Sequence, residues 1–207
     1  MRKPVALEHA SRLINHGPTV LVSSEWEGRR NVMATAWSMP VEFVPPRLAI
    51  VIDKRTLTRE LVTASGRLAL NLPCRRNADV AYTVGSCSGR DFAGHGSDKF
   101  ATFGIQSFPG PSLGLPLVDG CVAWMECVVL PSPETEQRYD TFFVEVVSAL
   151  ADDAVFREGR WQFDEGNADL HTLHHLGGGA FALPSRTLQA GQLPPVGGDG
   201  VECAQGG

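Results

Sequence analysis

The chain has 207 residues, of which 43% are hydrophobic and 20% are charged, as is usual for one soluble globular domain. Eighteen Lys and Arg residues against twenty-three Asp and Glu residues give a net charge of −5. Nucleic acid is not expected as a partner, because phosphate binding requires a basic face and the chain has no run of Lys or Arg. The apolar runs are strand-sized, so no membrane-spanning helix is expected.

The cysteines and the first residues together indicate a reducing compartment. The cysteines are odd in number and form no C-x-x-C pair, which favours reduced thiols over a disulfide framework or a zinc site. Glu8 and Arg12 interrupt the apolar stretch that a signal peptide needs. We therefore expect a cytoplasmic protein. The five cysteines are Cys74, Cys87, Cys121, Cys127 and Cys203.

Short helices alternate with apolar strands along the chain. The spacing of apolar residues predicts helices over residues 5–14, 56–65 and 77–86, and another from Ser97. Runs of β-branched and apolar residues predict strands over residues 19–26, 31–37, 47–53, 67–73, 118–130 and 139–151. The segments between strands are expected to be a turn at 27–30, a loop before Pro45-Pro46, a loop at 104–116 and a Pro- and Glu-rich turn before 139.

Two of the predicted helices carry terminal signals. Thr56 is the predicted N-cap of the 56–65 helix and Gly66 its terminator. Asn77 is the predicted cap of the 77–86 helix. The inward face of that helix is expected to contain Val80, Ala81 and Val84. Beyond a domain spanning residues 1–183, the Gly- and Pro-rich residues 184–207 are expected to be a disordered tail.

A charged turn opens the 56–65 helix and suggests an anion site. Lys54 and Arg55 lie at a helix start, where cations are otherwise unfavourable. A phosphate held by these two side chains and Thr58, beside Asp53, would explain their position. The alternative is a solvated turn with an ordinary cap.

The preceding strand supplies partners for a flat ring. Thr35 and Ser38 carry hydroxyls, while Ala34 and Ala36 leave room for backbone amides to approach a ring edge. The alternative is an ordinary barrel strand with Trp37 in the core. Asn31, just after a turn, fits turn chemistry and a cofactor-adjacent role equally well.

Two further segments are candidate sites. Residues 85–103 are Gly-rich but contain neither a P-loop nor a dinucleotide fingerprint. Within them, Ser88–Asp91 and Lys99 form either a surface loop or part of a ligand site. The spacing of His171, His174 and His175 would place them near one helical face, but no carboxylate or cysteine partner is identifiable, so no metal is predicted.

Three segments, in order, resemble one known family. They are N-x-M-A-T-A-W-S-x-P-V-x-F-x-P-P from Asn31, D-K-R-T-x-T from Asp53, and SGRD followed by DKF. Their combination resembles the flavin reductase-like family of FMN-binding split β-barrels, flavoredoxin type, over residues 14–182. Family members often have T-A-S-W where this chain has A-T-A-W, and residues 92–97 are inserted between SGRD and DKF.

This resemblance implies a mainly β fold with peripheral helices, arranged as an antiparallel Greek-key split β-barrel. It also implies bound FMN and a homodimer with the flavin near the subunit interface. The cofactor-binding residues expected from the motifs and the resemblance are Asn31, Ala34, Thr35, Ala36, Trp37, Ser38, Asp53, Lys54, Arg55, Thr58 and Ser88.

The expected activity is flavin chemistry. No nucleophile or metalloprotease signature occurs, so no catalytic side chain is predicted. The resemblance implies that NAD(P)H passes a hydride to FMN and that electrons continue to a monooxygenase, another electron-accepting protein or a small acceptor. The alternatives are an FMN-binding electron carrier without direct NAD(P)H oxidation, and a haem protein using His95 or one of the histidines at 171–175.

Overall fold

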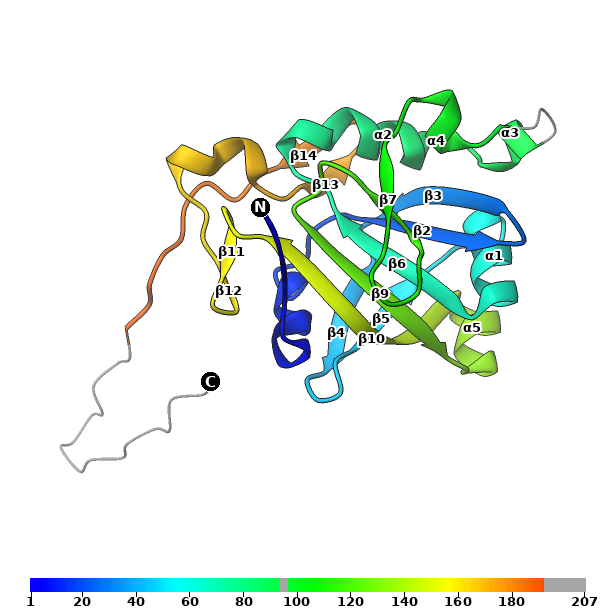
Figure 1. Cartoon of the computed structure of the whole chain (residues 1–207), viewed down its shortest axis with the longest axis horizontal. Coiled ribbons are helices and arrows are strands. Elements are labelled where there is room, and N and C mark those ends of the chain that lie inside the picture. Colours follow the sequence, from blue (N-terminus) through cyan, green and yellow to red (C-terminus); the bar gives the residue numbers. More distant parts are fainter. Residues whose placement is uncertain (94–96, 192–207) are drawn as a thin grey trace.

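The computed structural model describes residues 1–93 and 97–191 and is dominated by one antiparallel sheet (Figure 1). The order of its main path is β3-β2-β6-β9-β10-β5-β4, and β1 pairs with the end of β10. These strands are β1 (Arg2–Pro4), β2 (Val20–Trp26), β3 (Arg29–Thr35), β4 (Ser38–Glu42), β5 (Arg47–Val51), β6 (Arg67–Leu72), β9 (Ala123–Leu130) and β10 (Thr141–Asp152).

The two ends of this sheet are consecutive along the chain. β3 pairs only with β2 and β4 only with β5 among the described residues. The chain passes from one edge to the other through Ala36 and Trp37, and the Trp37 carbonyl accepts a hydrogen bond of 3.0 Å from the Val51 amide. The sheet therefore does not close by hydrogen bonding. Instead the sheet curls so that its edge strands β3 and β4 come near each other, and residues 36–37 connect them.

The interior of the curled sheet is apolar. Along β10 buried and half-buried residues alternate, as expected for a strand with one covered face. Each fully buried Leu, Ile or Phe contributes about 1.5–3 kcal/mol through burial. The cluster includes Leu48, Ile50, Leu68, Leu70, Met125, Phe142 and Val144.

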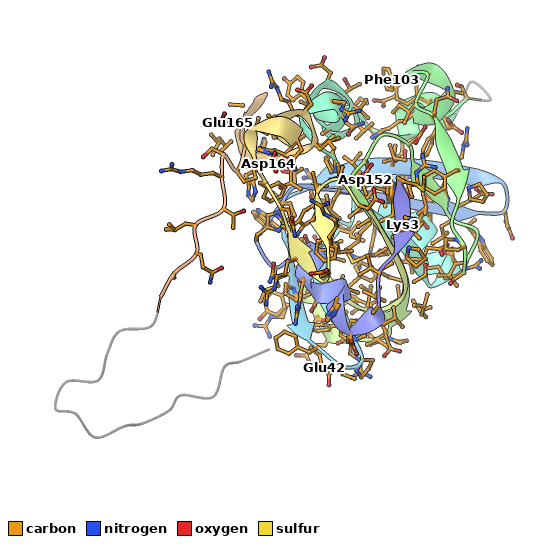
Figure 2. The ribbon with its side chains drawn as sticks, turned by 60° about the vertical axis from the view of Figure 1, so that its left-hand side comes forward. Lys3, Glu42, Phe103, Asp152, Asp164 and Glu165 are labelled. Atoms are coloured by element: carbon orange, nitrogen blue, oxygen red, sulfur yellow. The ribbon has the colours of Figure 1, made fainter. Side chains whose placement is uncertain are left out.

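Helices and small hairpins surround the sheet. In Figure 1, α2 and α4 run along the upper side, above β3 and β2, while α1 and α5 lie together at one end. Glu42 of β4 and Phe103, after α4, lie at opposite ends of the molecule in Figure 2. The helices are α1 (Leu57–Ser65), α2 (Ala78–Ser86), α3 (Arg90–Ala93), α4 (Lys99–Thr102) and α5 (Pro133–Tyr139), with 3-10 helices η1 (Leu7–Leu13), η2 (Arg75–Asn77) and η3 (Glu165–Leu170).

Three two-stranded sheets complete the described part of the fold. They are β7 (Ser107–Pro109) with β8 (Pro116–Val118), β11 (Phe156–Arg157) with β12 (Arg160–Trp161), and β13 (His174–Gly177) with β14 (Ala180–Ala182). In the described ranges, no helix has the length and apolar character needed to cross a membrane.

The mainly β, antiparallel fold with peripheral helices is confirmed, and so are the signals of the first long helix. The Thr56 hydroxyl accepts a hydrogen bond from the Arg59 amide at 3.1 Å. Gly66 adopts a left-handed φ of 67° and ends α1, which a residue without a side chain does at little cost. Ala81 and Val84 of α2 are buried, while Val80 is half-buried.

Several local predictions were wrong. The Asn77 side chain does not cap α2. Its Oδ1 accepts a hydrogen bond from the Cys74 amide at 3.1 Å and so caps the N-terminus of η2 instead. The expected helix at 5–14 is the 3-10 helix η1. The expected loop at 104–116 contains β7 and the first residue of β8.

Two proline-containing segments also differ from expectation. The stretch before Pro45 is the edge strand β4, which contains Pro40, because an edge position needs no ladder N–H there. The Pro-rich turn before β10 is α5, which begins at Pro133, where a helix needs no N–H. Residues 184–191 of the expected tail have no helix or strand, and 192–207 lie outside the described residues.

Candidate functional site

Two adjoining clefts lie between β3 and α2. One, of about 360 Å³, extends toward the β13–β14 hairpin; we call it the aromatic cleft, and its lining includes Thr35, Ala36, Tyr82, His175 and Phe181. The other, of about 410 Å³, extends toward the start of α1; we call it the basic cleft, and its lining includes Asn31, Asp53, Arg55, Thr56, Ser88 and Lys99. Both are lined by Ala34, Gly85 and Ser86.

Small residues allow this junction. A Cβ placed on Gly85 of α2 would lie 3.2 Å from the Ala34 Cβ of β3. Such a contact is tight, so a larger side chain at either position would push helix and strand apart. Ala34 of β3 thus has a packing role that the sequence alone does not reveal.

Asn31 lines the basic cleft, and its side chain forms only part of its possible hydrogen bonds with the described residues. The side chain is buried, with 2% exposed, and its Nδ2 donates to the Thr58 hydroxyl at 2.8 Å. Its Oδ1 is buried and accepts no hydrogen bond from the described residues. A Cβ on Gly89 would lie 2.3 Å from that oxygen, so only a residue without a side chain lets the backbone at position 89 pack this closely against Asn31.

Lys99 brings a buried positive charge to the same cleft. The residue is 2% exposed, and its Nζ donates to the Val84 carbonyl at 2.6 Å, near the end of α2. The negative end of a helix favours a cation there. Burial lowers the pKa of Lys99. In the described ranges no carboxylate forms an ion pair with this ammonium, so an anion in the cleft would compensate it.

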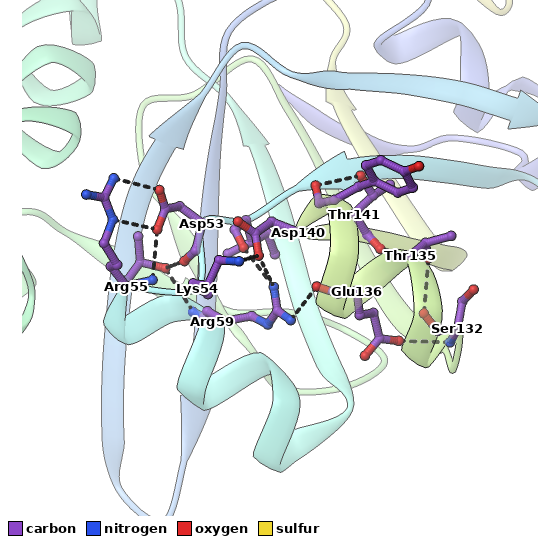
Figure 3. A network of polar contacts seen from close by, with 12 residues as sticks. Asp53, Lys54, Arg55, Arg59, Ser132, Thr135, Glu136, Asp140 and Thr141 are labelled. Atoms are coloured by element: carbon purple, nitrogen blue, oxygen red, sulfur yellow. Dashed lines mark hydrogen bonds and ion pairs between the residues drawn. The ribbon is translucent and has the colours of Figure 1, made fainter.

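The side chains of the charged turn point in two directions, one toward the basic cleft and the other into an adjacent polar network (Figure 3). Arg55 lines the basic cleft and holds Asp53 through Nε at 3.1 Å and Nη2 at 2.9 Å. These hydrogen bonds lower the pKa of Asp53 to about 2. Lys54 points instead toward Asp140, at 3.8 Å, where Arg59 also pairs and ties α1 to α5.

Some of the remaining predicted residues line the clefts and others do not. Thr35 lines the aromatic cleft, and its hydroxyl accepts from the Trp37 amide at 3.1 Å. Trp37 is 72% exposed, so the alternative that placed it in the core was wrong. The Ser38 hydroxyl is buried without a partner in the described chain. The clefts bring together Asn31, Ala34, Thr35, Ala36, Asp53, Arg55 and Ser88, but Trp37, Ser38, Lys54 and Thr58 do not line them.

The sequence reasoning missed the contribution of α2 and of the terminal hairpin. Tyr82 and Cys87 line the clefts from α2 and its end, and His175 and Phe181 from β13 and β14. Apolar periodicity marks buried faces and carries no information about an exposed face such as that of Tyr82. The nearest available signals were Gly85-Ser86 near a helix end and the glycines at 177–179.

The expected helical histidine face is absent. His171 ends η3, whereas His174 and His175 belong to β13. The His171 Nε2 lies 2.8 Å from Asn167 Oδ1 and 3.0 Å from the Asp164 carbonyl, so the ring is already engaged. No group of three potential metal ligands occurs within residues 1–93 and 97–191. His95 lies outside these ranges.

Comparison with known proteins finds relatives that match most of the chain. An uncharacterized protein of Escherichia coli K12, YddH, is 53% identical over 191 residues, covering 91% of this chain and 97% of that protein. An FMN-binding domain of a flavin reductase-like enzyme from Shewanella baltica OS155 has a TM-score of 0.87 and 40% identity, covering 92% of this chain and 98% of that one.

A more distant structure shares the fold. The flavoredoxin of Desulfovibrio vulgaris has a TM-score of 0.68 and 23% identity, covering 84% of this chain and 90% of that one. The split-barrel architecture is thereby confirmed, with its edges joined by the chain rather than by hydrogen bonds. The family model described as "Flavin reductase like domain" matches residues 12–171. The chain therefore belongs to the flavin reductase-like family, whose solved members include FMN-binding proteins.

Proposed function

We propose that this protein binds FMN along the joined clefts and catalyses hydride transfer from NAD(P)H to the flavin. The observation that carries the proposal is the junction at Ala34 and Gly85, where a basic and an aromatic cleft meet. FMN has the matching polarity: a phosphate dianion at one end and a flat ring at the other. When bound, FMN supplies the hydride-accepting chemistry, and the protein supplies position and electrostatics.

The basic cleft suits the phosphate. Thr56 and Leu57, at the start of α1, line it, and the first amides of a helix attract anions. Arg55 and Lys99 add charge from two sides, and each charge-assisted hydrogen bond contributes about 1.5–3 kcal/mol. Asn31, held in place by the Thr58 hydroxyl, lines the same space with a polar side chain.

The aromatic cleft suits the ring. Of the segment 34–38, residues 34–36 line this cleft, and their backbone would face the polar edge of the ring, as small side chains at Ala34 and Ala36 permit. Tyr82 and Phe181 provide flat apolar surfaces for packing. NAD(P)H would approach from the open side, and the acceptor of electrons would be a partner protein or a small molecule.

A second copy of the chain fits the exposed edge of the sheet. Along β4 and the residues beside it, five large apolar side chains are exposed, in an arrangement that a monomer seldom leaves uncovered. They are Trp37, Met39, Val41, Phe43 and Val44. We propose that a homodimer covers this stripe, next to the segment 34–38. Light scattering of wild type and Val41→Lys tests this, and an unchanged monomer in both would contradict it.

The function is tested by spectroscopy and rapid kinetics. FMN is titrated into the colourless protein, and the loaded protein is mixed anaerobically with NADH or NADPH while flavin absorbance is followed. Bleaching of the flavin band by either coenzyme supports the reductase. FMN uptake without bleaching indicates an electron carrier instead. Failure to bind FMN would overturn the whole proposal.

A further inference from the structure

A pair of arginines lies beside the basic cleft and is not needed to explain FMN binding. Arg29, at the start of β3, donates to Glu60 Oε1 at 2.8 Å, and Arg90, at the start of α3, donates to Glu60 Oε2 at 2.9 Å. One carboxylate of α1 thus holds two guanidinium groups. We call Arg29, Glu60 and Arg90 the arginine ledge.

The ledge is joined directly to the cleft. The Arg90 Nε donates to the Arg55 carbonyl at 3.3 Å, and the Arg90 amide donates to the Ser88 hydroxyl at 3.2 Å. Arg55 and Ser88 both line the basic cleft. A molecule that extends out of the cleft past these residues therefore meets the ledge next.

The charge of the ledge is unbalanced. Two cations face one anion, in a chain whose net charge is −5. Hydrogen bonds from Arg29 and Arg90 lower the pKa of Glu60, so the carboxylate stays ionised at neutral pH. Both arginine side chains are about half exposed. The bonds to described residues use only part of their N–H donors, and the remaining donors can bind a phosphate in the forked geometry that guanidinium favours.

We infer that the arginine ledge binds the 2′-phosphate of NADPH and makes NADPH the preferred coenzyme over NADH. This inference rests on the proposed function, because it requires the coenzyme to reach the flavin through the same opening. The two coenzymes differ only in that phosphate monoester, so a site of positive charge outside the flavin cleft can discriminate between them.

The test compares coenzymes on the FMN-loaded protein. For Arg90→Gln we expect the KM for NADPH to rise about tenfold, equivalent to about 1.4 kcal/mol, with kcat nearly unchanged. Arg29→Gln should have a similar but smaller effect, because this residue is one step further from the cleft. The KM for NADH should change by less than about twofold in both variants.

Arg75→Gln is the matched control. Arg75 is likewise exposed and ion-paired, to Asp169 at 3.2 Å, but it lines neither cleft, so neither coenzyme should be affected. Higher ionic strength should weaken the binding of NADPH more than that of NADH in the wild type, and this difference should be smaller in Arg90→Gln. Equal changes for both coenzymes, no change for either, or a wild-type preference for NADH would overturn the inference.

Binding without turnover separates this inference from the proposed function. NADP⁺ and NAD⁺ are titrated into the FMN-loaded protein, with flavin fluorescence as the signal. Suppose that neither reduced coenzyme is oxidised, but that NADP⁺ binds more tightly than NAD⁺ and loses this advantage in Arg90→Gln. The arginine ledge is then supported as a phosphate site, and the proposed reductase activity is contradicted. If Arg90→Gln weakens FMN as much as NADPH, Arg90 belongs to the FMN site and the ledge is not a coenzyme site.

Discussion

Glu126 and Lys99 are both buried ionisable side chains, yet their surroundings differ. Glu126, on β9, is 1% exposed and accepts from the amides of Ser112, Leu113 and Leu115 and from the Ser148 hydroxyl. Lys99, 2% exposed, makes one hydrogen bond to the described residues, with the Val84 carbonyl as acceptor. A completely paired buried charge holds a loop in place, whereas the buried ammonium of Lys99 beside the basic cleft is available for the anion binding that we propose.

The largest expected effect follows from replacing Glu126, which accepts all the hydrogen bonds of its network. Glu126→Ala leaves three amides and a hydroxyl without their acceptor, and each unsatisfied buried group costs about 1–3 kcal/mol. We expect the free energy of unfolding to fall by about 4 kcal/mol in urea denaturation. Ser148→Ala, which removes one donor and leaves the carboxylate well bonded, should cost about 1 kcal/mol. Equal losses in the two variants would contradict the structural role of the network.

His16 extends the comparison, because it is a half-buried, partly paired ionisable group that lines neither cleft. Burial, and next the nearby His174, lower the pKa of His16 to about 4, and its Nδ1 has no partner among the described residues. Here the group stays neutral rather than requiring an anion. The unfolded chain binds the proton near pH 6.5, so stability present above that pH should be lost as the pH falls toward 4, by up to about 3 kcal/mol.

Urea denaturation between pH 7 and pH 4 measures this loss. His16→Phe keeps a ring beside Trp161 and Phe163 but cannot titrate, so its stability should fall less steeply over the same range. Parallel pH curves for the wild type and the variant would show that other groups cause the acid sensitivity.

Lys99→Met tests whether the buried ammonium of Lys99 serves FMN binding rather than stability. Removing a buried, underpaired ammonium should leave the stability of the FMN-free protein unchanged or higher. The same change should weaken FMN binding by about tenfold to a hundredfold, because one charge-assisted contact of about 1.5–3 kcal/mol is lost. Thermal unfolding without FMN and a flavin titration give the two values. Loss of stability with unchanged FMN affinity would make Lys99 structural, like Glu126.

The smallest expected difference lies between neighbouring cations of the charged turn. Arg55→Ala should weaken FMN binding about tenfold, since Arg55 lines the basic cleft. Lys54→Ala should change it by less than about threefold, since Lys54 is directed toward Asp140. Equal losses in the flavin titration would place both side chains on the phosphate, as the sequence pattern suggests.

Local signals in the sequence were sufficient for part of the site. The order of the motifs identified the family, and the cap at Thr56 with the terminator at Gly66 fixed the helix that opens beside the basic cleft. Asn31, Ala34 and Arg55 were predicted from those motifs, and the structure brings them together. Prolines misled the prediction, because Pro40 at a sheet edge and Pro133 at a helix start break no hydrogen bond.

The sequence by itself determined the mainly β composition, the strand predicted over residues 139–151 and the helix boundaries around Thr56 and Gly66, because these depend on neighbours along the chain. Only the tertiary structure decided that Gly85 meets Ala34, that Lys99 is buried against the Val84 carbonyl and that Trp37 is exposed. Those features depend on which distant segments pack together. Whether a buried polar atom is satisfied is a property of that packing and not of any single segment.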